Sequence, residues 1–197
     1  GIPLGVLAAR RHNSTVDYAI VGGSLTLRTI PIFVLGPMLM VLLVLTLKIL
    51  DVPIGWKGLL HPQVILPILL LAAAPLADVL RQTRASYLEV ISNDYVRTAH
   101  AKGLKTQRVV WGHVMRNALL PVVTSLGLIV NALIHGSVFV DRMFSIPGFG
   151  SIVVNAIQLL DIPVILGTTI FSTLLVMLAN LTVDLLYPLI DPRVRLK

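Results

Sequence analysis

The chain has 197 residues, of which 56% are hydrophobic and 13% charged, and its net charge is +7. Several charge-free runs approach the roughly 20 residues that cross a bilayer, which indicates an all-α, polytopic membrane protein and excludes an ordinary soluble domain. Barrel strands would alternate over about ten residues, whereas residues 29–47 and 117–140 are apolar on every side, so helices are expected. The absence of cysteine excludes disulfides, thiol catalysis and cysteine metal sites.

The positive charge predicts an orientation rather than a nucleic-acid partner. Only three of the 16 Lys and Arg residues, Lys48, Lys57 and Arg142, are expected on the outer side. The others are expected on the inner side: Arg10, Arg11, Arg28, Arg81, Arg84, Arg97, Lys102, Lys105, Arg108, Arg116, Arg193, Arg195 and Lys197. Because basic loops of membrane proteins stay in the cytoplasm, this bias predicts a multi-pass protein with a cytoplasmic C-terminus and no nucleic-acid binding.

In chain order, the pattern predicts four complete spans plus the end of one more. The first nine residues are apolar and end at Arg10, like the last turns of a span whose beginning is missing. Complete spans are expected at 25–50, 63–80, 117–140 and 164–187, with an outer loop at 51–62, an outer excursion at 141–163 and a cytoplasmic loop at 81–116. Five prolines in or beside these spans are expected to kink them: Pro31, Pro37, Pro67, Pro75 and Pro121. No initiator Met or signal peptide is present, so an upstream part is expected to be removed, disordered or not included.

A basic, glycine-interrupted segment at 94–121 is the main candidate for function. Val96, Ala99 and Gly103 recur at helical spacing, which predicts a helix over 95–102 with a small apolar face, broken at Gly103. A second helix is expected from Leu104. Its predicted apolar face, opposite the basic residues, is formed by Val110, Trp111 and Val114. Two short helices joined at a glycine could dock into a soluble protein or lie on anionic lipid, and the pattern alone leaves both open.

The residues RTAHAKG and NALLP in this segment resemble the cytoplasmic coupling-loop signature of ABC importer permeases. Arg97 replaces the glutamate of the general pattern, and Leu120-Pro121 comes later than in sugar-type permeases. Both departures are similar to the dipeptide, oligopeptide and nickel branch, in which YVRTAxAKG and RNALLPV are usual. The runs TRASYLEV, GSVFVDRMFSIPGFGSIVVNAI and NLTVDLLYPLIDPRVR extend the resemblance over nearly the whole chain.

This resemblance implies a single transmembrane permease domain over 1–197 with the type I ABC importer fold, lacking its N-terminal part. It implies a bacterial inner-membrane importer for di- or oligopeptides, with nickel, glutathione and haem as alternative cargoes. The implied partners are a second permease subunit, similar but not identical, two ABC ATPase subunits and an extracytoplasmic substrate-binding protein. The expected ATPase contact is Thr98, Ala99, Gly103 and Leu104, with Arg97 and Lys102 as rim charges.

Catalysis is not expected on this chain. It has no GxxxxGK[ST] phosphate loop, so ATP and Mg²⁺ are expected on the ATPase partners and no cofactor on this subunit. Its five histidines lie on separate segments without metal-binding spacing, and no Ser/His/Asp arrangement is visible. A secondary transporter, which would need an intramembrane ionisable residue, and a membrane scaffold remain alternatives.

Five residues are candidates for the translocation pathway. His135 and Asn131, one helical turn apart, are costly in lipid and are expected to face the bundle interior with Ser137, or to bridge helices. Phe144 and Phe149, in the outer segment, could contact passing substrate or anchor to headgroups. The outer segment at 141–163 is expected to contain a turn followed by a short amphipathic helix.

Overall fold

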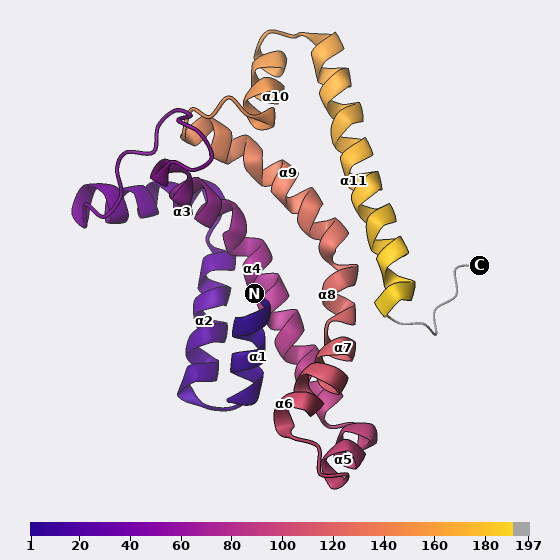
Figure 1. Ribbon diagram of the computed structural model, residues 1–197. Helices are drawn as coiled ribbons and strands as arrows, with labels where there is room; N and C mark the ends of the chain where they lie inside the picture. Colours follow the sequence, from indigo (N-terminus) through magenta and orange to yellow (C-terminus); the bar gives the residue numbers. More distant parts are fainter. Residues whose placement is uncertain (191–197) are drawn as a thin grey trace. The chain divides into compact units, whose positions relative to one another are not determined.

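The computed structural model describes residues 1–190, and these are helical apart from short turns and a longer non-helical stretch at 47–61 (Figure 1). The all-α fold class is confirmed, and the described residues contain no strand. The predicted cytoplasmic tail cations Arg193, Arg195 and Lys197 lie outside the described residues. The residue contacts divide the chain into two compact units. Unit 1 comprises Gly1–Leu25, Leu76–Gly127 and the chain from Ala179 onward, and unit 2 comprises Thr26–Pro75 and Leu128–Leu178.

Unit 1 is built on the second half of a long helix, α4 (Ile65–Ile91). Its other elements are α1 (Ile2–Arg10), most of α2 (Thr15–Thr29), α5 (Asp94–Ala101), α6 (Thr106–Val109), the π-helical turn Val110–Val114, α7 (Met115–Ala118), α8 (Leu120–Thr124), the start of α9 (Leu126–Met143) and the end of α11 (Ile162–Ile190). Helix α1 approaches α4 closely, because a Cβ added at Gly5 would lie 2.6 Å from the carbonyl oxygen of Leu80. Ala8 and Ala9 are buried in unit 1.

Unit 2 contains α3 (Ile32–Leu39), which continues into the π-helical turn Met40–Thr46, and the 3₁₀ turn Pro62–Val64. It also contains the first part of α4, most of α9, α10 (Phe149–Gln158) and the first part of α11. Its core is a cluster of buried apolar side chains: Leu35, Val44, Leu66, Leu70, Val140 and Phe144.

Three helical stretches among the described residues are long and apolar enough to cross a membrane: Pro62–Ile91, Leu126–Met143 and Ile162–Leu186. They agree with three of the predicted spans. The predicted span at 25–50 corresponds to a bent pair of helices, because α2 and α3 meet at a bend of 109°, and the expected kink at Pro31 is confirmed. Together, this bent pair would make a fourth span. The break lies at Pro31, which lacks an N–H and disfavours helical geometry at Ile30.

The other prolines differ in their effect. Pro75 lies inside α4 without ending the helix, whereas Pro121 follows the break between α7 and α8. Helix α4 also continues past its predicted end, so residues 81–91, expected in the cytoplasmic loop, are helical. The segment that contains α5 is therefore connected directly to a candidate membrane span by only two residues, Ser92 and Asn93.

Candidate functional site

The first helix of the coupling segment, residues 94–121, ends in a turn that only a few residue types can form. Gly103 has a φ of +74°, and its N–H donates to the carbonyl of His100 at 2.9 Å. The N–H of Leu104 donates to the carbonyl of Ala99 at 3.4 Å, which completes a Schellman motif. The predicted break at Gly103 is confirmed, because glycine adopts this left-handed conformation without a steric penalty. The second helix was predicted to begin at Leu104, but in the structure it begins at Thr106.

The inner face of α5 is packed against the rest of unit 1. Val96 is 2% exposed and Ala99 6%, and both belong to an apolar cluster. Its other buried members are Ala9, Tyr87, Val90, Val109, Val110, Val114, Met115 and Ala118. Leu104, just after the turn, packs against the same cluster. The small apolar face that the spacing predicted is thus the face that holds α5 on its own chain.

The outer face of α5 carries the exposed candidates. Of the six residues expected at the ATPase contact, Arg97, Thr98, Lys102 and Gly103 are exposed, Leu104 is half-buried and Ala99 is buried. The side chains of Arg97 and Asp94 are 80% and 98% exposed and lie 3.9 Å apart, so this ion pair contributes at most about 1 kcal/mol. The Thr98 hydroxyl donates to the carbonyl of Asp94 at 2.9 Å. The surface offered to a partner is therefore basic and is formed around the Gly103 turn.

The second half of the coupling segment differs from its predicted pattern. Val110 and Val114 are buried, but Trp111 is 67% exposed, so the three residues do not share one apolar face as predicted. They lie in a π-helical turn, whose wider pitch changes the direction of each side chain relative to an α-helix. Asn117 Nδ2 donates to the Tyr95 hydroxyl at 2.8 Å, which joins α7 to α5.

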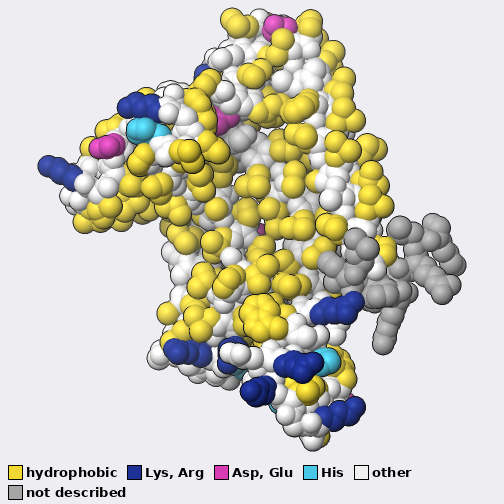
Figure 2. All heavy atoms as spheres, viewed as in Figure 1, with side chains coloured by type: hydrophobic (Ala, Val, Ile, Leu, Met, Phe, Trp, Pro, Cys, Tyr) yellow, Lys and Arg dark blue, Asp and Glu magenta, His cyan; other side chains and the backbone are white. Residues whose placement is uncertain are grey.

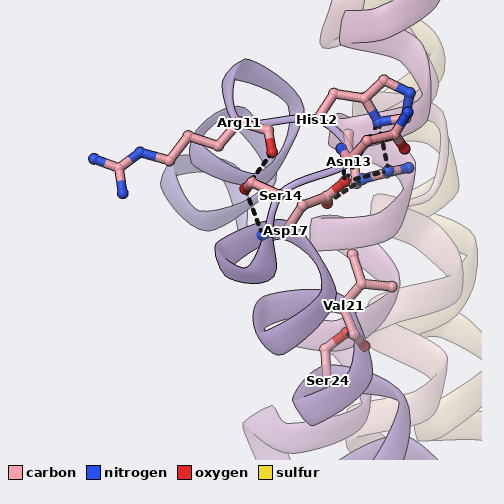
Figure 3. Close-up of polar contacts among 8 residues, drawn as sticks. Arg11, His12, Asn13, Ser14, Asp17, Val21 and Ser24 are labelled. Atoms are coloured by element: carbon pink, nitrogen blue, oxygen red, sulfur yellow. Dashed lines mark hydrogen bonds and ion pairs between the residues drawn. The ribbon is translucent and has the colours of Figure 1, made fainter.

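A polar cluster missed by the sequence analysis connects the first helices of unit 1 to α4. Asp17, in the first turn of α2, is only 1% exposed. Arg84 of α4 binds both carboxylate oxygens, from Nε to Oδ1 at 2.7 Å and from Nη2 to Oδ2 at 2.7 Å. Figure 3 shows His12, Asn13 and Asp17 converging here from the turn between α1 and α2. The Asn13 N–H donates to Oδ2 at 3.0 Å, and His12 Nδ1 lies 3.0 Å from Arg84 Nη2.

This cluster is a specific joint rather than a loose surface pair. A guanidinium bound to both oxygens of a carboxylate has a fixed geometry, which a lysine cannot reproduce. The sequence did carry one signal for it, since Asp17 is the only acidic residue among the first 50. Its partner could not be identified from the sequence, because Arg84 is 67 residues away.

The predicted pathway residues lie in unit 2 and do not form one group. His135 is exposed in this chain, and its Nδ1 lies 2.8 Å from the carbonyl oxygen of Asn131 in the same helix. The Ser137 hydroxyl donates to the carbonyl of Ile134 at 2.8 Å. Each of these side chains thus has one hydrogen-bond partner on the backbone of α9.

The two phenylalanine candidates differ from each other. Phe144 is completely buried in the core of unit 2, so substrate contact there would require that core to open. Phe149 is half-buried at the start of α10, and its ring centroid lies 5.7 Å from that of Phe171 in α11. Asn131 and Ser137 are also half-buried.

The outer segment contains the predicted turn and helix, and two neighbouring residues of α9 hold them. The Asp141 carboxylate accepts from the Gly150 N–H at 2.9 Å, at the start of α10. Arg142 donates to the side-chain oxygens of Asn155 and Gln158, at 2.9 and 3.2 Å, near the end of α10. Helix α10 is therefore fastened to α9 at both ends.

The coupling segment borders a small hollow. Within residues 1–190, no three His, Asp or Glu side chains are grouped closely enough to hold a metal ion. A hollow of about 230 Å³ lies between α4, α5 and the following helices, lined by residues that include Tyr87, Val96 and Val110. It is smaller than typical small-molecule sites of roughly 300–1,000 Å³.

Comparison with known proteins agrees with this description. Residues 1–196 match the model of the family described as binding-protein-dependent transport system inner membrane component. The chain is 40% identical over 196 residues to the dipeptide transport system permease protein DppB of Bacillus subtilis, covering all of this chain and 63% of the relative. It is 41% identical over 202 residues to the oligopeptide permease AppB of the same organism (98% and 63% covered), and 37% identical over 195 residues to the oligopeptide permease OppB of Salmonella typhimurium (99% and 63%). The chain thus spans about 63% of the length of these relatives. With a family match over nearly its whole length, it belongs to the binding-protein-dependent transport system inner membrane components.

Proposed function

We propose that this chain is a permease subunit of an ATP-driven importer of di- or oligopeptides in the bacterial inner membrane. The cargo is inferred from the names of the relatives, which are dipeptide and oligopeptide permeases. The working assembly would contain a second permease subunit, two ATPase subunits that hold ATP and Mg²⁺, and an extracytoplasmic binding protein. The family description, which refers to binding-protein-dependent transport, supports the last of these partners.

The observation that carries the coupling role is the two-sided character of α5. Its inner face is fixed by Val96 and Ala99, while Arg97, Thr98 and Lys102 remain exposed outside. A short helix that is rigid on one side and open on the other is suited to sit in a groove of a partner. We place the ATPase contact on this outer face and at Gly103, with Ala99 and Leu104 supporting it from beneath.

The connections of α5 give the contact a mechanical role. Ser92 and Asn93 link α5 to α4, and the Tyr95–Asn117 hydrogen bond joins it to α7, which leads towards α9. Movement of α5 on ATPase closure would therefore reach two candidate spans together. Such movement would bias the permease between outward-open and inward-open states.

The pathway itself would be formed with the second permease subunit. His135, Asn131, Ser137 and Phe149 stay as candidates because none of them is fully buried in this chain. We do not include Phe144 in the proposed pathway, because its ring is part of the apolar core of unit 2.

The transport activity can be tested with the full set of subunits in sealed vesicles. We expect uptake of a labelled dipeptide to require ATP and the binding protein. Competition with oligopeptides, nickel chelates, glutathione and haem would identify the cargo. Uptake driven by a proton or sodium gradient would instead indicate a secondary transporter. If no cargo is taken up, the remaining alternative is a membrane scaffold.

The contact itself can be tested at Gly103. Gly103→Val should abolish coupled uptake, because a β-branched residue in a left-handed conformation costs about 1–2 kcal/mol and its side chain would add bulk to the contact. Gly103→Asn preserves the turn, since Asn tolerates this conformation, but still adds a side chain. Loss of ATPase binding in both variants would place the contact at Gly103. Normal binding and uptake in both would rule it out.

A further inference from the structure

We propose that the second half of the coupling segment binds anionic phospholipid headgroups, while the first half binds the ATPase. The lipid surface is formed by Lys105, Arg108, Trp111 and Arg116, and we call it the basic-aromatic face. All four side chains are exposed. They lie on α6, the π-helical turn and α7, after the Gly103 turn that separates them from α5.

The charge of this region points to an anionic partner. From residue 95 to residue 127 the sequence has no Asp or Glu, but it has five Lys and Arg residues: Arg97, Lys102, Lys105, Arg108 and Arg116. In the part of the chain that the structure describes, Lys105, Arg108 and Arg116 have no acidic side chain within ion-pair distance. Figure 2 shows dark blue side chains gathered over α5–α7. Basic residues beside a membrane span are attracted by acidic lipids.

The position of the face along the helix points to lipid rather than to a distant protein groove. The Leu119 N–H donates to the carbonyl of Met115 and the Val123 N–H to that of Leu119, so the chain stays helical across the break that precedes Pro121. The apolar run of the span begins near Asn117. Asn117 lies six positions after Trp111, which is at most about 9 Å along the helix axis. That distance places Trp111 at the depth of the headgroups.

The chemistry of Trp111 agrees with this depth. An exposed tryptophan is costly in water, but its amphipathic ring is favoured at the membrane–water interface. Its exposure follows from the π-helical turn, which directs Val110 and Val114 into unit 1 and leaves Trp111 outside. Trp111 with Arg108 and Arg116 thus combines the two residue types that anchor a helix at an anionic surface.

A spin label can measure what covers this face in the assembled transporter. The chain has no cysteine, so one introduced cysteine gives one label once the partners' cysteines are replaced. Gly112→Cys is suitable because an added Cβ there meets no atom within 4 Å. Ala101→Cys, at the exposed end of α5, reports on the proposed ATPase contact. The complex is reconstituted in nanodiscs of phosphatidylcholine, with or without phosphatidylglycerol.

We expect the label at position 112 to collide more often with oxygen than with a water-soluble nickel chelate. The ratio of oxygen to chelate collisions should rise when phosphatidylglycerol is present. The label at Ala101 should instead be shielded by the ATPase. If the ATPase shields Gly112, or if Gly112 stays water-exposed in both lipids, the lipid proposal is wrong. If Ala101 is not shielded while Gly112 meets lipid, the ATPase contact is wrong and the lipid proposal stands.

Substitutions test the charges separately. In the Gly112→Cys background, Arg108→Gln and Arg116→Gln should each weaken the preference for phosphatidylglycerol about fivefold. Arg11→Gln, an exposed cation after α1 that lies outside both proposed contacts, is the matched control and should leave that preference unchanged. Equal effects of all three variants would show a diffuse charge effect and overturn the assignment to the basic-aromatic face.

Discussion

Gly127 lies where α9 begins, against Asn180 of α11, and an added side chain would meet the amide end of Asn180. A Cβ added at Gly127 would overlap the amide oxygen of Asn180 and lie 3.0 Å from its Cγ. Because the Asn180 amide must turn away, we expect Gly127→Ala to destabilise the protein by about 0.5–1.5 kcal/mol, the usual cost of a displaced side-chain rotamer. Thermal unfolding of the purified protein in detergent measures this change.

Two further variants make the test specific to this contact. Gly127→Ala combined with Asn180→Ala should recover part of the lost stability, because the second substitution makes space for the first. Gly167→Ala, at a position of α11 where an added Cβ meets nothing within 4 Å, should be neutral or stabilising by up to about 1 kcal/mol. No recovery in the double variant would show that Asn180 is not the cause.

For single residues, the sequence predicts the structural role when that role depends on neighbouring positions in the chain. The break at Gly103 could be predicted because a glycine interrupts a helical pattern, and the buried side of α5 because Val96 and Ala99 follow helical spacing. The Asp17–Arg84 pair could not be predicted in the same way. Its partners are 67 residues apart, and only the packing of α2 against α4 brings them together.

Among the helices, α10 depends most clearly on groups from another element. Its first turn has free N–H groups, and no side chain of its own caps them. The Asp141 carboxylate of α9 supplies the acceptor, at 2.9 Å from the Gly150 nitrogen. We expect Asp141→Ala to loosen α10 by about 0.5–2 kcal/mol, the usual cost of losing an N-terminal cap. Faster amide hydrogen exchange in Phe149–Gln158 would report it.

The matched variant at the other end of α10 is Arg142→Gln, which removes the donors to Asn155 and Gln158. Arg142 is exposed, so we expect a smaller effect, confined to the last turn of α10. Unchanged exchange over the whole helix in Asp141→Ala would contradict a capping role for the carboxylate. Asp141→Asn keeps an acceptor oxygen and should lie between Asp141→Ala and the parent chain.

The element boundaries show where a hydropathy pattern is insufficient. In residues 25–50 the sequence predicts a span kinked at Pro31, but it does not predict the size of the bend, which divides the span into two helices that meet at 109°. Pro75 has the same chemistry and leaves α4 continuous. The position of a proline is therefore visible in the sequence, while its effect depends on the packing around it. The exposure of Trp111 was missed for a related reason, since a π-helical turn has no clear signal in hydrophobic spacing.

Over the whole chain, the Asp17–Arg84 pair is a polar connection between the first two helices and α4. Asp17 is buried, and Arg84 lies seven residues before the end of the helix that leads into α5. If ATPase closure moves α5, a firm joint at Arg84 would carry that movement to α1 and α2. We expect Asp17→Asn to lower the melting temperature of the assembled transporter and also the amount of peptide imported per ATP hydrolysed.

The ratio of import to hydrolysis separates a mechanical role from a structural one. Arg84→Lys keeps the positive charge but cannot bind both carboxylate oxygens in the same way, so it should also lower that ratio. Arg81→Gln is the matched control: Arg81 lies on the same helix, 3.4 Å from Asp78, and both side chains are more than 40% exposed. Such a pair contributes little, and the control should couple as the parent does. If Asp17→Asn and Arg84→Lys reduce stability but import as much peptide per ATP as the parent, the joint stabilises unit 1 without transmitting movement.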